Sequence, residues 1–325
     1  MSPEASKPAI TPYPYNVGQV LTLKRPNGRE FSATITQTYP VTLSPAMVVQ
    51  VHKGNETYEA VLKLHDRRFG DDRKENPYND DSPEPQTAQA EITWQEFVRQ
   101  GLLAPLLHRF EYKERMWAEE GKLEWERLGE QEGNYHYKAQ KRYKEVRAYD
   151  QLRSLQGRCV PRFFTPVTLE MPSAQPDLDP SCFRVPGLLM ERLNGFNLSN
   201  LVTELPEGPP ELWRDIIQKA ADIAADVNRA GVLDFDGQPR NIVVVRLEDG
   251  TYKPFKIDFG HASIKSDFND TDDWDEYRCW KRYVYENDNP GAIGCIMTSK
   301  VKRLTGIQLD DIIYDSILPD LEGID

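Results

Sequence analysis

The chain has 325 residues, enough for one large domain or two small ones with an ample core. Its formal net charge of -12, with basic and acidic residues interspersed, disfavours nucleic acid and anionic membrane as partners. No apolar run reaches the length of a membrane span or a signal-peptide core, and the four cysteines show no C-x-x-C spacing. We therefore expect an intracellular protein, cytoplasmic or nuclear, that binds neither nucleic acid nor membrane.

The first part of the chain predicts a region rich in β-strands. Residues 1–16 are Pro-rich and are expected to be disordered. Strands are predicted at 29–36 and 47–52, and a third at 58–64 carries a single lysine, Lys63, among apolar residues. Taken alone, Lys63 fits a solvated position on an edge strand as well as a functional site.

Residues 66–140 form an insertion between the Lys63 strand and the next predicted helix. The charged, Pro- and Asn-rich stretch 71–85 predicts a loop, and Thr93–Glu96 predicts a capping box at a helix start. Helical sequence continues through 105–127. The apolar anchors of the insertion are Trp94, Phe97, Leu106, Leu107, Phe110, Trp117 and Trp125. They either pack the insertion against the strands or make residues 93–127 a docking surface for a protein partner.

Two elements then lead into the second half of the chain. A helix is predicted at 141–152, where Val146, Tyr149 and Leu152 recur at helical spacing and Glu145 flanks them. An apolar strand at 187–191 ends in Met-Glu and is soon followed by glycine. Helical glutamates usually face solvent and apolar strands usually belong to a core, so neither element marks a site by itself.

The second half contains the residues that suit phosphoryl-transfer chemistry. A helix predicted at 211–230 leads to Asp236 and Asn241, which are five residues apart. Apolar runs on both sides of Asp249-Gly250 predict a β-hairpin that returns Asp258 to the neighbourhood of Asn241. Phosphoryl transfer needs a carboxylate that orients or deprotonates an acceptor hydroxyl, and oxygen ligands that hold Mg²⁺. Asp236 suits the first role, and Asn241 and Asp258 suit the second.

This ordered set resembles the protein kinase-like superfamily. Residues 234–241 resemble the motif H-R-D-L-x-x-x-N with Asp234 and Phe235 at its first two positions, and 258–260 read D-F-G. The resemblance covers residues 29–64 and 140–262. The chain looks most similar to the kinase-like proteins of fungal genomes and to aminoglycoside-type phosphotransferases.

The resemblance implies an α+β, two-lobed protein kinase-like fold. Its small lobe would span 17–190, with an antiparallel sheet, the glutamate helix and the helical insertion at 66–140, and a mainly helical, shortened large lobe would span 191–325. It also implies ATP and Mg as cofactors, with a role for each matching residue. Lys63 would contact the nucleotide phosphates, Glu145 would ion-pair with Lys63, Met190 would line the adenine pocket, the Glu191 carbonyl and Leu193 amide would bind adenine, Asp236 would be catalytic, and Asn241 and Asp258 would ligate metal.

Departures from the family pattern leave two hypotheses open. The loop 39–45 has no glycine and two prolines where kinases place a glycine-rich loop, and no A-P-E follows Gly260, after which 65 residues remain. Within that tail, helices are predicted at 272–285 and 292–303. The chain is either a phosphotransferase, with a small-molecule acceptor favoured over a protein, or a pseudokinase or nucleotide-binding scaffold. Asp234 places a second carboxylate near Asp236, which either raises one pKa by repulsion or adds a metal ligand.

Overall fold

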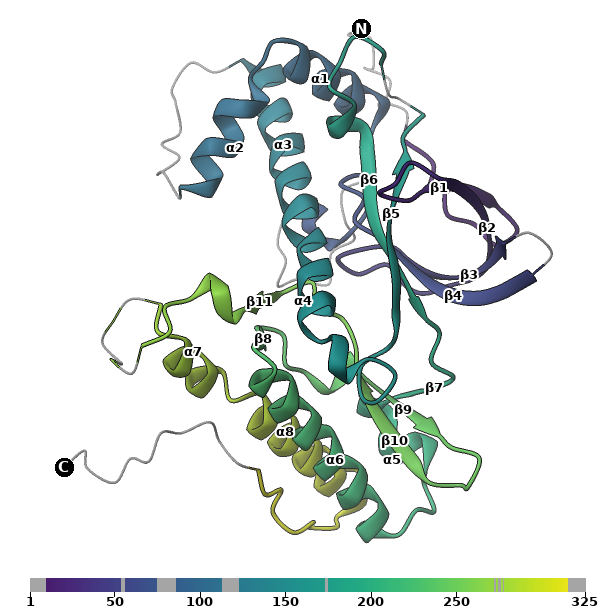
Figure 1. Ribbon diagram of the computed structural model, residues 1–325, viewed down its shortest axis with the longest axis vertical. Helices are drawn as coiled ribbons and strands as arrows, with labels where there is room; N and C mark the ends of the chain where they lie inside the picture. The colour runs from purple at the N-terminus through teal and green to yellow at the C-terminus, as the bar shows by residue number, and fades with distance from the viewer. Residues whose placement is uncertain are drawn as a thin grey trace, which may run out of the picture. The chain divides into compact units, whose positions relative to one another are not determined.

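The computed structural model describes residues 10–53, 56–74, 86–112, 123–172, 175–271, 273, 276 and 278–314. It has an α+β architecture (Figure 1), and the chain divides into two compact units. Unit 1 comprises Met1–Tyr143 and Phe164–Met190, and unit 2 comprises Lys144–Phe163 and Glu191–Asp325. Among the described helices, none combines the length and apolar character that crossing a membrane requires.

Unit 1 is built on a closed barrel with the strand order β1-β2-β3-β4-β6-β5. The strands are β1 (Val20–Lys24), β2 (Glu30–Thr38), β3 (Ala46–Lys53), β4 (Glu56–Leu64), β5 (Phe163–Glu170) and β6 (Arg184–Glu191). The first four strands pair antiparallel in sequence order, as at Leu21 with Ala33 and Val49 with Ala60, and β1 pairs antiparallel with β5. The three strands predicted from the sequence are confirmed as β2, β3 and β4.

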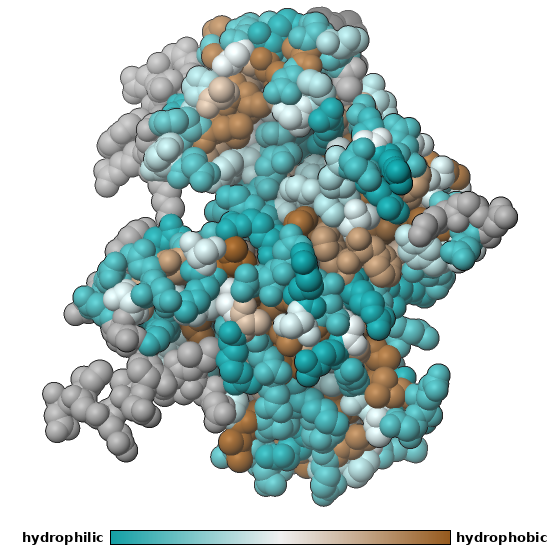
Figure 2. Space-filling view, in the orientation of Figure 1, coloured by the Kyte–Doolittle hydropathy of each residue, from teal (hydrophilic) through white to brown (hydrophobic). Residues whose placement is uncertain are grey.

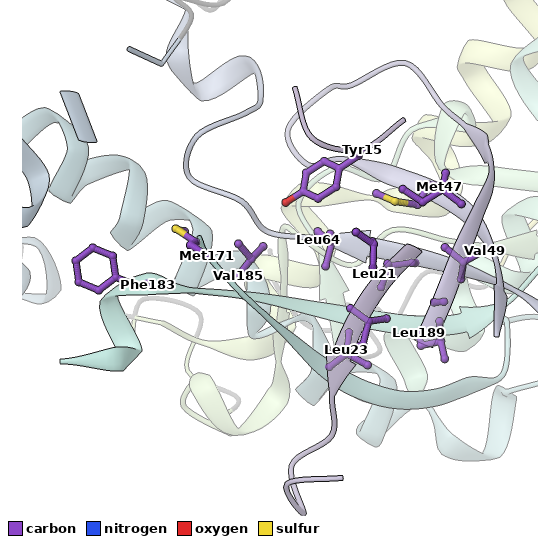
Figure 3. Packing of buried hydrophobic residues seen from close by; sticks show 14 of the residues in the cluster. Tyr15, Leu21, Leu23, Met47, Val49, Leu64, Met171, Phe183, Val185 and Leu189 are labelled. Atoms are coloured by element: carbon purple, nitrogen blue, oxygen red, sulfur yellow. The ribbon is translucent and has the colours of Figure 1, made fainter. Parts of the chain in front are cut away.

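The barrel interior is filled by side chains that alternate along the strands. Leu21 and Leu23 of β1 lie in one buried cluster with Val49 and Leu189 (Figure 3), while Val20 and Thr22 on the same strand are exposed. Each fully buried leucine or valine contributes roughly 1.5–3 kcal/mol relative to exposure. The barrel therefore has a packed core of its own.

The part of the N-terminal segment that the structure describes contacts this core through Tyr13 and Tyr15, although residues 1–16 were expected to be disordered. Residues 1–9 lie outside the described part of the chain, but Tyr15 is 1% exposed and its hydroxyl donates to Asp66 Oδ2 at 2.5 Å. Tyr13 packs edge-on against Tyr15 and Phe69 at 5.3 and 5.2 Å. These ring contacts hold the described part of the Pro-rich segment against the core.

Asp66 is the polar centre of that contact. Burial by itself raises the pKa of its carboxyl, but the ion pair with Arg68 and the hydrogen bond from Tyr15 outweigh burial, so its pKa lies below the usual range. The buried carboxylate is therefore ionised and ties the N-terminal segment to the residues that follow β4.

The insertion forms three helices of unit 1, namely α1 (Ala88–Arg99), α2 (Leu103–Glu111) and α3 (Glu124–Tyr143). The predicted helix start at Thr93 is wrong, because Thr87 caps α1 by accepting from the Ala90 amide at 3.1 Å and Thr93 is buried inside the helix. The predicted loop 71–85 begins with a short 3-10 helix at Asp71–Arg73, and its residues 75–85 lie outside the described part. The predicted run 105–127 spans the end of α2 and the start of α3, and Trp117 lies outside the described part.

The insertion shares its core with the barrel. Trp94, Phe97 and Leu106 are buried in the same cluster as the barrel residues, as the first alternative expected. Two glycines of α3 permit this packing: a Cβ at Gly129 would lie 2.4 Å from Phe97 Cδ2, and one at Gly133 would lie 2.5 Å from Leu106 Cδ2. Both helices therefore approach the α3 backbone more closely than any side chain would allow.

One hydrophobic patch remains on the outside of the insertion. Figure 2 shows a face that is mostly hydrophilic, with hydrophobic residues gathered over α2 and α3. The partly buried residues Leu107, Phe110 and Trp125 belong to this part of the chain. Nothing in the structure says what would cover the patch, so partner docking on 93–127 stays a prediction.

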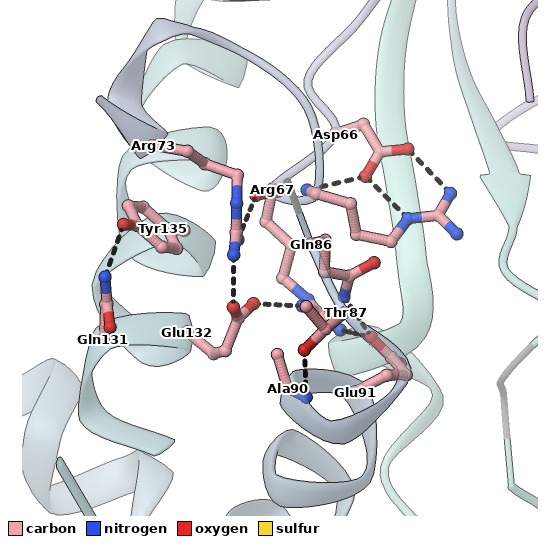
Figure 4. Close-up of polar contacts among 11 residues, drawn as sticks. Asp66, Arg67, Arg73, Gln86, Thr87, Ala90, Glu91, Gln131, Glu132 and Tyr135 are labelled. Atoms are coloured by element: carbon pink, nitrogen blue, oxygen red, sulfur yellow. Dashed lines mark hydrogen bonds and ion pairs between the residues drawn. The ribbon is translucent and has the colours of Figure 1, made fainter. Parts of the chain in front are cut away.

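Buried charges anchor the insertion to the segment after β4 (Figure 4). Glu132 of α3 is fully buried and accepts from Arg67 at 2.6 Å and from Arg73 at 2.9 Å. Arg67 also pairs with Glu91 of α1 at 2.6 Å and lies over the Trp94 ring at 4.7 Å. One arginine thus holds both α1 and α3 to the loop that leaves the barrel.

Unit 2 is built around two long helices and two small sheets. The helices are α4 (Glu145–Gln151), α5 (Leu201–Glu204), α6 (Pro210–Arg229), α7 (Trp280–Asn287) and α8 (Asn289–Thr305). The strands are β7 (Gly195–Asn197), β8 (Val232–Asp234), β9 (Ile242–Arg246), β10 (Tyr252–Lys256) and β11 (Ala262–Ile264). They form sheets of order β10-β9-β7 and β11-β8. Helix α6 packs against α8 and β10, and side chains such as Ile216, Ala220, Ile293 and Met297 fill the core between them.

Several predicted helices of unit 2 are found with altered ends. The helix predicted at 211–230 is confirmed as α6, and the one at 292–303 lies within α8. Residues 141–152 do not form one helix, because α3 ends at Tyr143 and α4 begins at Glu145. The helix predicted at 272–285 begins only at Trp280, and residues 272, 274, 275 and 277 lie outside the described part.

Candidate functional site

Asp236 and Asn241 lie in one tight turn of unit 2. The buried strand β8 ends at Asp234, and a 3-10 turn, Pro239–Asn241, precedes β9. The Gln238 amide donates to the Asp236 carbonyl at 2.7 Å, and the Asn241 amide donates to the Gln238 carbonyl at 2.9 Å. Pro239 begins the turn with a fixed φ and has no amide hydrogen to satisfy. The turn therefore folds residue 241 back onto residue 236.

Both oxygens of the Asp236 carboxylate are engaged within this turn. Asn241 Nδ2 donates to Asp236 Oδ2 at 3.0 Å and to the Asp236 carbonyl at 2.9 Å. The exposed guanidinium of Arg240 donates to Asp236 Oδ1 at 2.5 Å. Because Nδ2 is the atom that faces Asp236, the amide oxygen of Asn241 is the atom that remains for a cation.

The predicted hairpin that leads to Asp258 is confirmed. β9 and β10 pair antiparallel from Arg246 with Tyr252 to Ile242 with Lys256. One residue further, the Ile257 amide donates to the Asn241 carbonyl at 2.9 Å. Asp258 therefore follows directly on a backbone hydrogen bond to Asn241, and the two residues are neighbours although 17 positions separate them.

Asp258 has an unusual backbone conformation. Its φ is 60°, in the left-handed region that few residues other than glycine adopt, although aspartate tolerates it better than most. Its Oδ1 accepts from the Gly260 amide at 3.1 Å. Such a conformation persists only where surrounding contacts fix it, and it is concentrated at functional sites.

Glu145 supplies one of those contacts. Its side chain is 1% exposed, so the solvent-facing alternative is excluded, and its Oε1 accepts from the Phe259 amide at 2.9 Å. The Phe259 ring is fully buried and packs edge-on against Tyr149 of the same helix at 5.3 Å. Burial raises the pKa of Tyr149 well above its usual value, and the charges of Glu145 and Asp258 add to that effect. The tyrosine is therefore neutral and serves as packing for the segment around Asp258.

The remaining predicted site residues divide between the two units. Lys63 is partly buried on β4, which lies between β3 and β6 in the barrel, so the edge-strand alternative is wrong. Met190 is buried and belongs to unit 1, whereas Glu191 and Leu193 belong to unit 2. Because Lys63 and Glu145 belong to different units, their ion pair stays a prediction, as does the adenine site.

The loop 39–45, which stands where kinases carry glycines, is tied to the rest of unit 1. It is held by the Asp71 amide donating to the Thr42 carbonyl at 2.7 Å, Arg142 Nη1 donating to the Leu43 carbonyl at 3.4 Å, and a 3.0 Å contact between Ser44 Oγ and His65 Nδ1. The absence of glycine is therefore accompanied by a fixed loop conformation.

Lys256 and Arg240 are two residues of this region that the sequence predictions missed. Lys256 is 2% exposed, and its Nζ lies 2.5 Å from Asp234 Oδ2. For Asp234, the sequence suggested either repulsion with Asp236 or a metal-ligand role, and neither involved an ion pair with this lysine. The signal was a lone lysine between Phe255 and Ile257, at the end of a strand that proved to be buried.

The oxygens of Asn241 and Asp258 are the groups of this region that could contribute to a metal site. Among the described residues, no group of three or more His, Cys, Asp and Glu side chains is placed to hold a metal ion. Mg²⁺ is commonly held by one or two protein oxygens together with substrate phosphates and water. An amide oxygen from Asn241 and a carboxylate from Asp258 match that pattern.

Comparisons with known proteins add little to this geometry. No protein-family model matches the chain, and no curated protein matches it. One solved structure, described as "WaaP in complex with acyl carrier protein", is similar with 19% sequence identity and a TM-score of 0.31. The likeness covers 46% of this chain and 55% of that chain, so the chain spans about half the length of that protein. A likeness this weak does not show a shared fold.

Proposed function

We propose that the chain is an ATP- and Mg-dependent phosphotransferase with a two-lobed protein kinase-like fold, which moves the γ-phosphate to the hydroxyl of a small molecule. The observation that carries the proposal is the hydrogen-bonded turn of Asp236 and Asn241, joined by the Ile257 amide to the segment of Asp258. In this proposal the carboxylate of Asp236 would be catalytic and the oxygens of Asn241 and Asp258 would be metal ligands, in the chain order of the kinase motifs.

In this proposal, Asp236 acts on the acceptor. Its carboxylate orients the hydroxyl and takes up the proton as the acceptor oxygen bonds to the γ-phosphorus. The bond from that phosphorus to the β,γ-bridging oxygen breaks, and ADP leaves. Asn241 Nδ2, 3.0 Å from Oδ2, keeps the carboxylate in place during the transfer.

The oxygens of Asn241 and Asp258 are the groups that would hold Mg²⁺. When bound, the ion neutralises charge on the nucleotide phosphates. The left-handed backbone of Asp258 and the Glu145 contact to the next residue would keep the Asp258 carboxylate preorganised for the ion. Lys63 would add a cation for the phosphates, and Met190, Glu191 and Leu193 would line the adenine site.

A nucleotide-binding scaffold without catalysis is the second candidate. It is favoured by the 2.5 Å contact between Arg240 and Asp236 Oδ1, which occupies the carboxylate oxygen that Asn241 leaves free. The exposed side chain of Arg240 would compete with an acceptor hydroxyl for that oxygen. Under this candidate, nucleotide binds and no acceptor is phosphorylated.

Thermal shift and ATP consumption measured on the same samples test the proposal. Binding of 1 mM Mg·ATP with a Kd of 10 μM should stabilise the protein by about 2.7 kcal/mol and raise Tm by a few degrees. Asp258→Ala should lose the Mg-dependent shift. Asp236→Asn should keep the shift and lose transfer to every compound in a panel of hydroxylated metabolites. Asp215→Asn, an exposed change on α6, is the matched control and should behave as wild type.

The outcomes separate the two candidates. A wild-type protein that shows neither a metal-dependent shift nor ATP consumption overturns the phosphotransferase proposal. A metal-dependent shift without transfer to the metabolite panel or to generic protein substrates selects the scaffold. Loss of nucleotide binding in Asp236→Asn contradicts the role given to that carboxylate.

A further inference from the structure

A buried ion pair links the Asp236 turn to the Asp258 segment within unit 2. Asp234 is 1% exposed and Lys256 is 2% exposed, and Lys256 Nζ lies 2.5 Å from Asp234 Oδ2. Both residues end buried strands, Asp234 at the end of β8 and Lys256 at the end of β10. The pair therefore stands where the two functional segments begin.

Each partner uses its remaining hydrogen bonds on the backbone of the site. Asp234 Oδ1 accepts from the Asp236 amide at 3.0 Å. Lys256 Nζ donates to the Ile257 carbonyl at 2.9 Å and to the Asp258 carbonyl at 3.4 Å. A continuous chain of charged hydrogen bonds thus runs from the amide of the proposed catalytic residue to the carbonyl of the proposed metal ligand.

The pair also holds the surroundings of both segments. Lys256 Nζ lies 5.2 Å from the centre of the Phe259 ring, a cation–π contact with the residue after Asp258. The Asp234 carbonyl accepts from Asn289 Nδ2 at 2.9 Å, and Gly237 leaves room for that asparagine, since a Cβ there would lie 2.2 Å from Asn289 Oδ1. The first residue of α8 therefore fixes the β8 end of the chain of contacts.

A gain in the free energy of unfolding does not by itself explain why a buried ion pair is present here. Desolvation of two charges offsets much of their attraction, and a well-packed apolar pair of similar volume is often as stable. An apolar pair could not hold the Asp236 amide and two carbonyls beside a left-handed aspartate. A conformation of that kind persists only when neighbouring contacts fix it.

We propose that Asp234 and Lys256 form a positioning pair that sets the placement of Asp236 against Asp258. The inference rests on the proposed phosphotransferase function for the meaning of those two carboxylates. The pair itself touches neither nucleotide nor acceptor. It acts through the backbone on both sides of the site.

Two neutral double variants test the pair. Single changes leave one buried charge without its partner and are expected to destabilise strongly, so they do not separate folding from positioning. Asp234→Asn with Lys256→Met removes both charges and all donors to the two carbonyls. Asp234→Asn with Lys256→Gln also removes both charges but keeps an N–H donor at position 256. Lys253→Met, which removes a lysine over the Phe255 ring on the same strand, is the matched control.

The first readout is independent of activity. Hydrogen–deuterium exchange of residues 256–260, without nucleotide or metal, should be at least tenfold faster in the Lys256→Met double variant than in wild type. The Lys256→Gln double variant should recover to within about threefold of wild type, and Lys253→Met should not change. Wild-type exchange in the folded Lys256→Met double variant overturns the proposal. If that variant does not fold, fast exchange in a folded Lys256→Gln double variant overturns it instead.

The second readout asks whether positioning matters for function. The Mg²⁺ concentration that gives half-maximal stabilisation by 1 mM ATP should rise at least tenfold in the Lys256→Met double variant and recover in the Lys256→Gln double variant. If the pair served stability alone, the half-maximal Mg²⁺ concentration would be the same as in wild type in every double variant that folds. If wild type shows no Mg·ATP effect, the proposed function fails, while the exchange result still decides the positioning role.

Discussion

The backbone amide of Phe259 donates a 2.9 Å hydrogen bond to the buried carboxylate of Glu145. This contact joins α4 to the segment that carries Asp258, within one unit of the chain. It gives Glu145 a structural partner that is independent of any lysine.

Two replacements of Glu145 distinguish the loss of this hydrogen bond from the loss of the carboxylate charge. Glu145→Ala leaves a buried amide without its acceptor, which should lower the free energy of unfolding by about 1–3 kcal/mol. Glu145→Gln keeps an acceptor oxygen and should cost less. Guanidinium unfolding with hydrogen exchange at Phe259 measures both effects. Equal exchange at Phe259 in the two variants would show that the carboxylate does not hold that amide.

Glu132 should be among the most sensitive positions of unit 1. Glu132→Gln removes the charge that Arg67 and Arg73 share in the interior, and breaking such a buried pair typically costs about 3–5 kcal/mol. Urea unfolding is the measurement. Glu124→Gln, at an exposed position of the same helix, should change stability by no more than about 0.5 kcal/mol. A loss at Glu132 no larger than that of the control would contradict the buried network.

Gly129→Ala should destabilise the insertion although alanine is the better helix former. The new Cβ would lie 2.4 to 3.0 Å from three atoms of Phe97, including its Cβ, which cannot swing away. Overpacking of this kind costs about 1–3 kcal/mol, which exceeds the roughly 1 kcal/mol of helix propensity gained. Gly133→Ala meets only the far end of Leu106 closely and should cost less. Chemical denaturation that ranks the two variants in the opposite order would count against this packing.

His136 should make stability depend on pH below neutrality. Burial lowers its pKa from 6.5 to about 4, and the positive charge of Arg67 adds to the effect while Asp179 opposes it. The unfolded chain therefore takes up a proton between about pH 6.5 and 4 that the folded protein does not, so stability is full above pH 6.5 and falls as the pH drops.

The size of this effect follows from the shift. Between pH 7.5 and 5, wild type should lose about 2 kcal/mol more stability than His136→Gln, which has no imidazole to protonate. The difference between the two unfolding free energies at each pH removes the contribution of the carboxylates that both proteins share. Parallel pH profiles would mean that the pKa of His136 does not differ between the folded and the unfolded protein, which would contradict its lowered pKa.

Local signals explain which parts of the fold were predicted from sequence. The hairpin at Asp249-Gly250 and helix α6 are encoded within their own residues, by a turn dipeptide and by apolar spacing. The order of Tyr15 depends on Asp66, 51 positions away, and no local pattern announces that contact. Helix α1 begins at Ala88 with Thr87 as its cap, because the Thr87 side chain accepts from the Ala90 amide, and the sequence offered Thr93 as an equally plausible cap.

In the candidate site, too, the sequence predicted contacts between residues linked by a local pattern and missed a contact between distant ones. The spacing of Asp236, Asn241 and Asp258, together with one hairpin, predicted that they lie near one another in the chain's fold, and the hydrogen bonds of Asn241 agree with that placement. The Asp234–Lys256 pair was missed because its partners are 22 positions apart and each residue type is common at surfaces. Sequence spacing identifies residues that face a ligand more readily than those that hold the backbone behind them.

The tethered loop at 39–45 has a consequence for how often it opens. Three hydrogen bonds hold its middle part within unit 1, through Thr42, Leu43 and Ser44, and the Tyr39 amide and Pro45 carbonyl are bonded at its ends. At about 1 kcal/mol each, breaking all three leaves an open form with a population on the order of 1%. A ligand that required the open loop would have its apparent affinity reduced about a hundredfold, whereas one that fits the closed loop meets no such reduction. The loop therefore favours binding of ligands that fit its closed conformation.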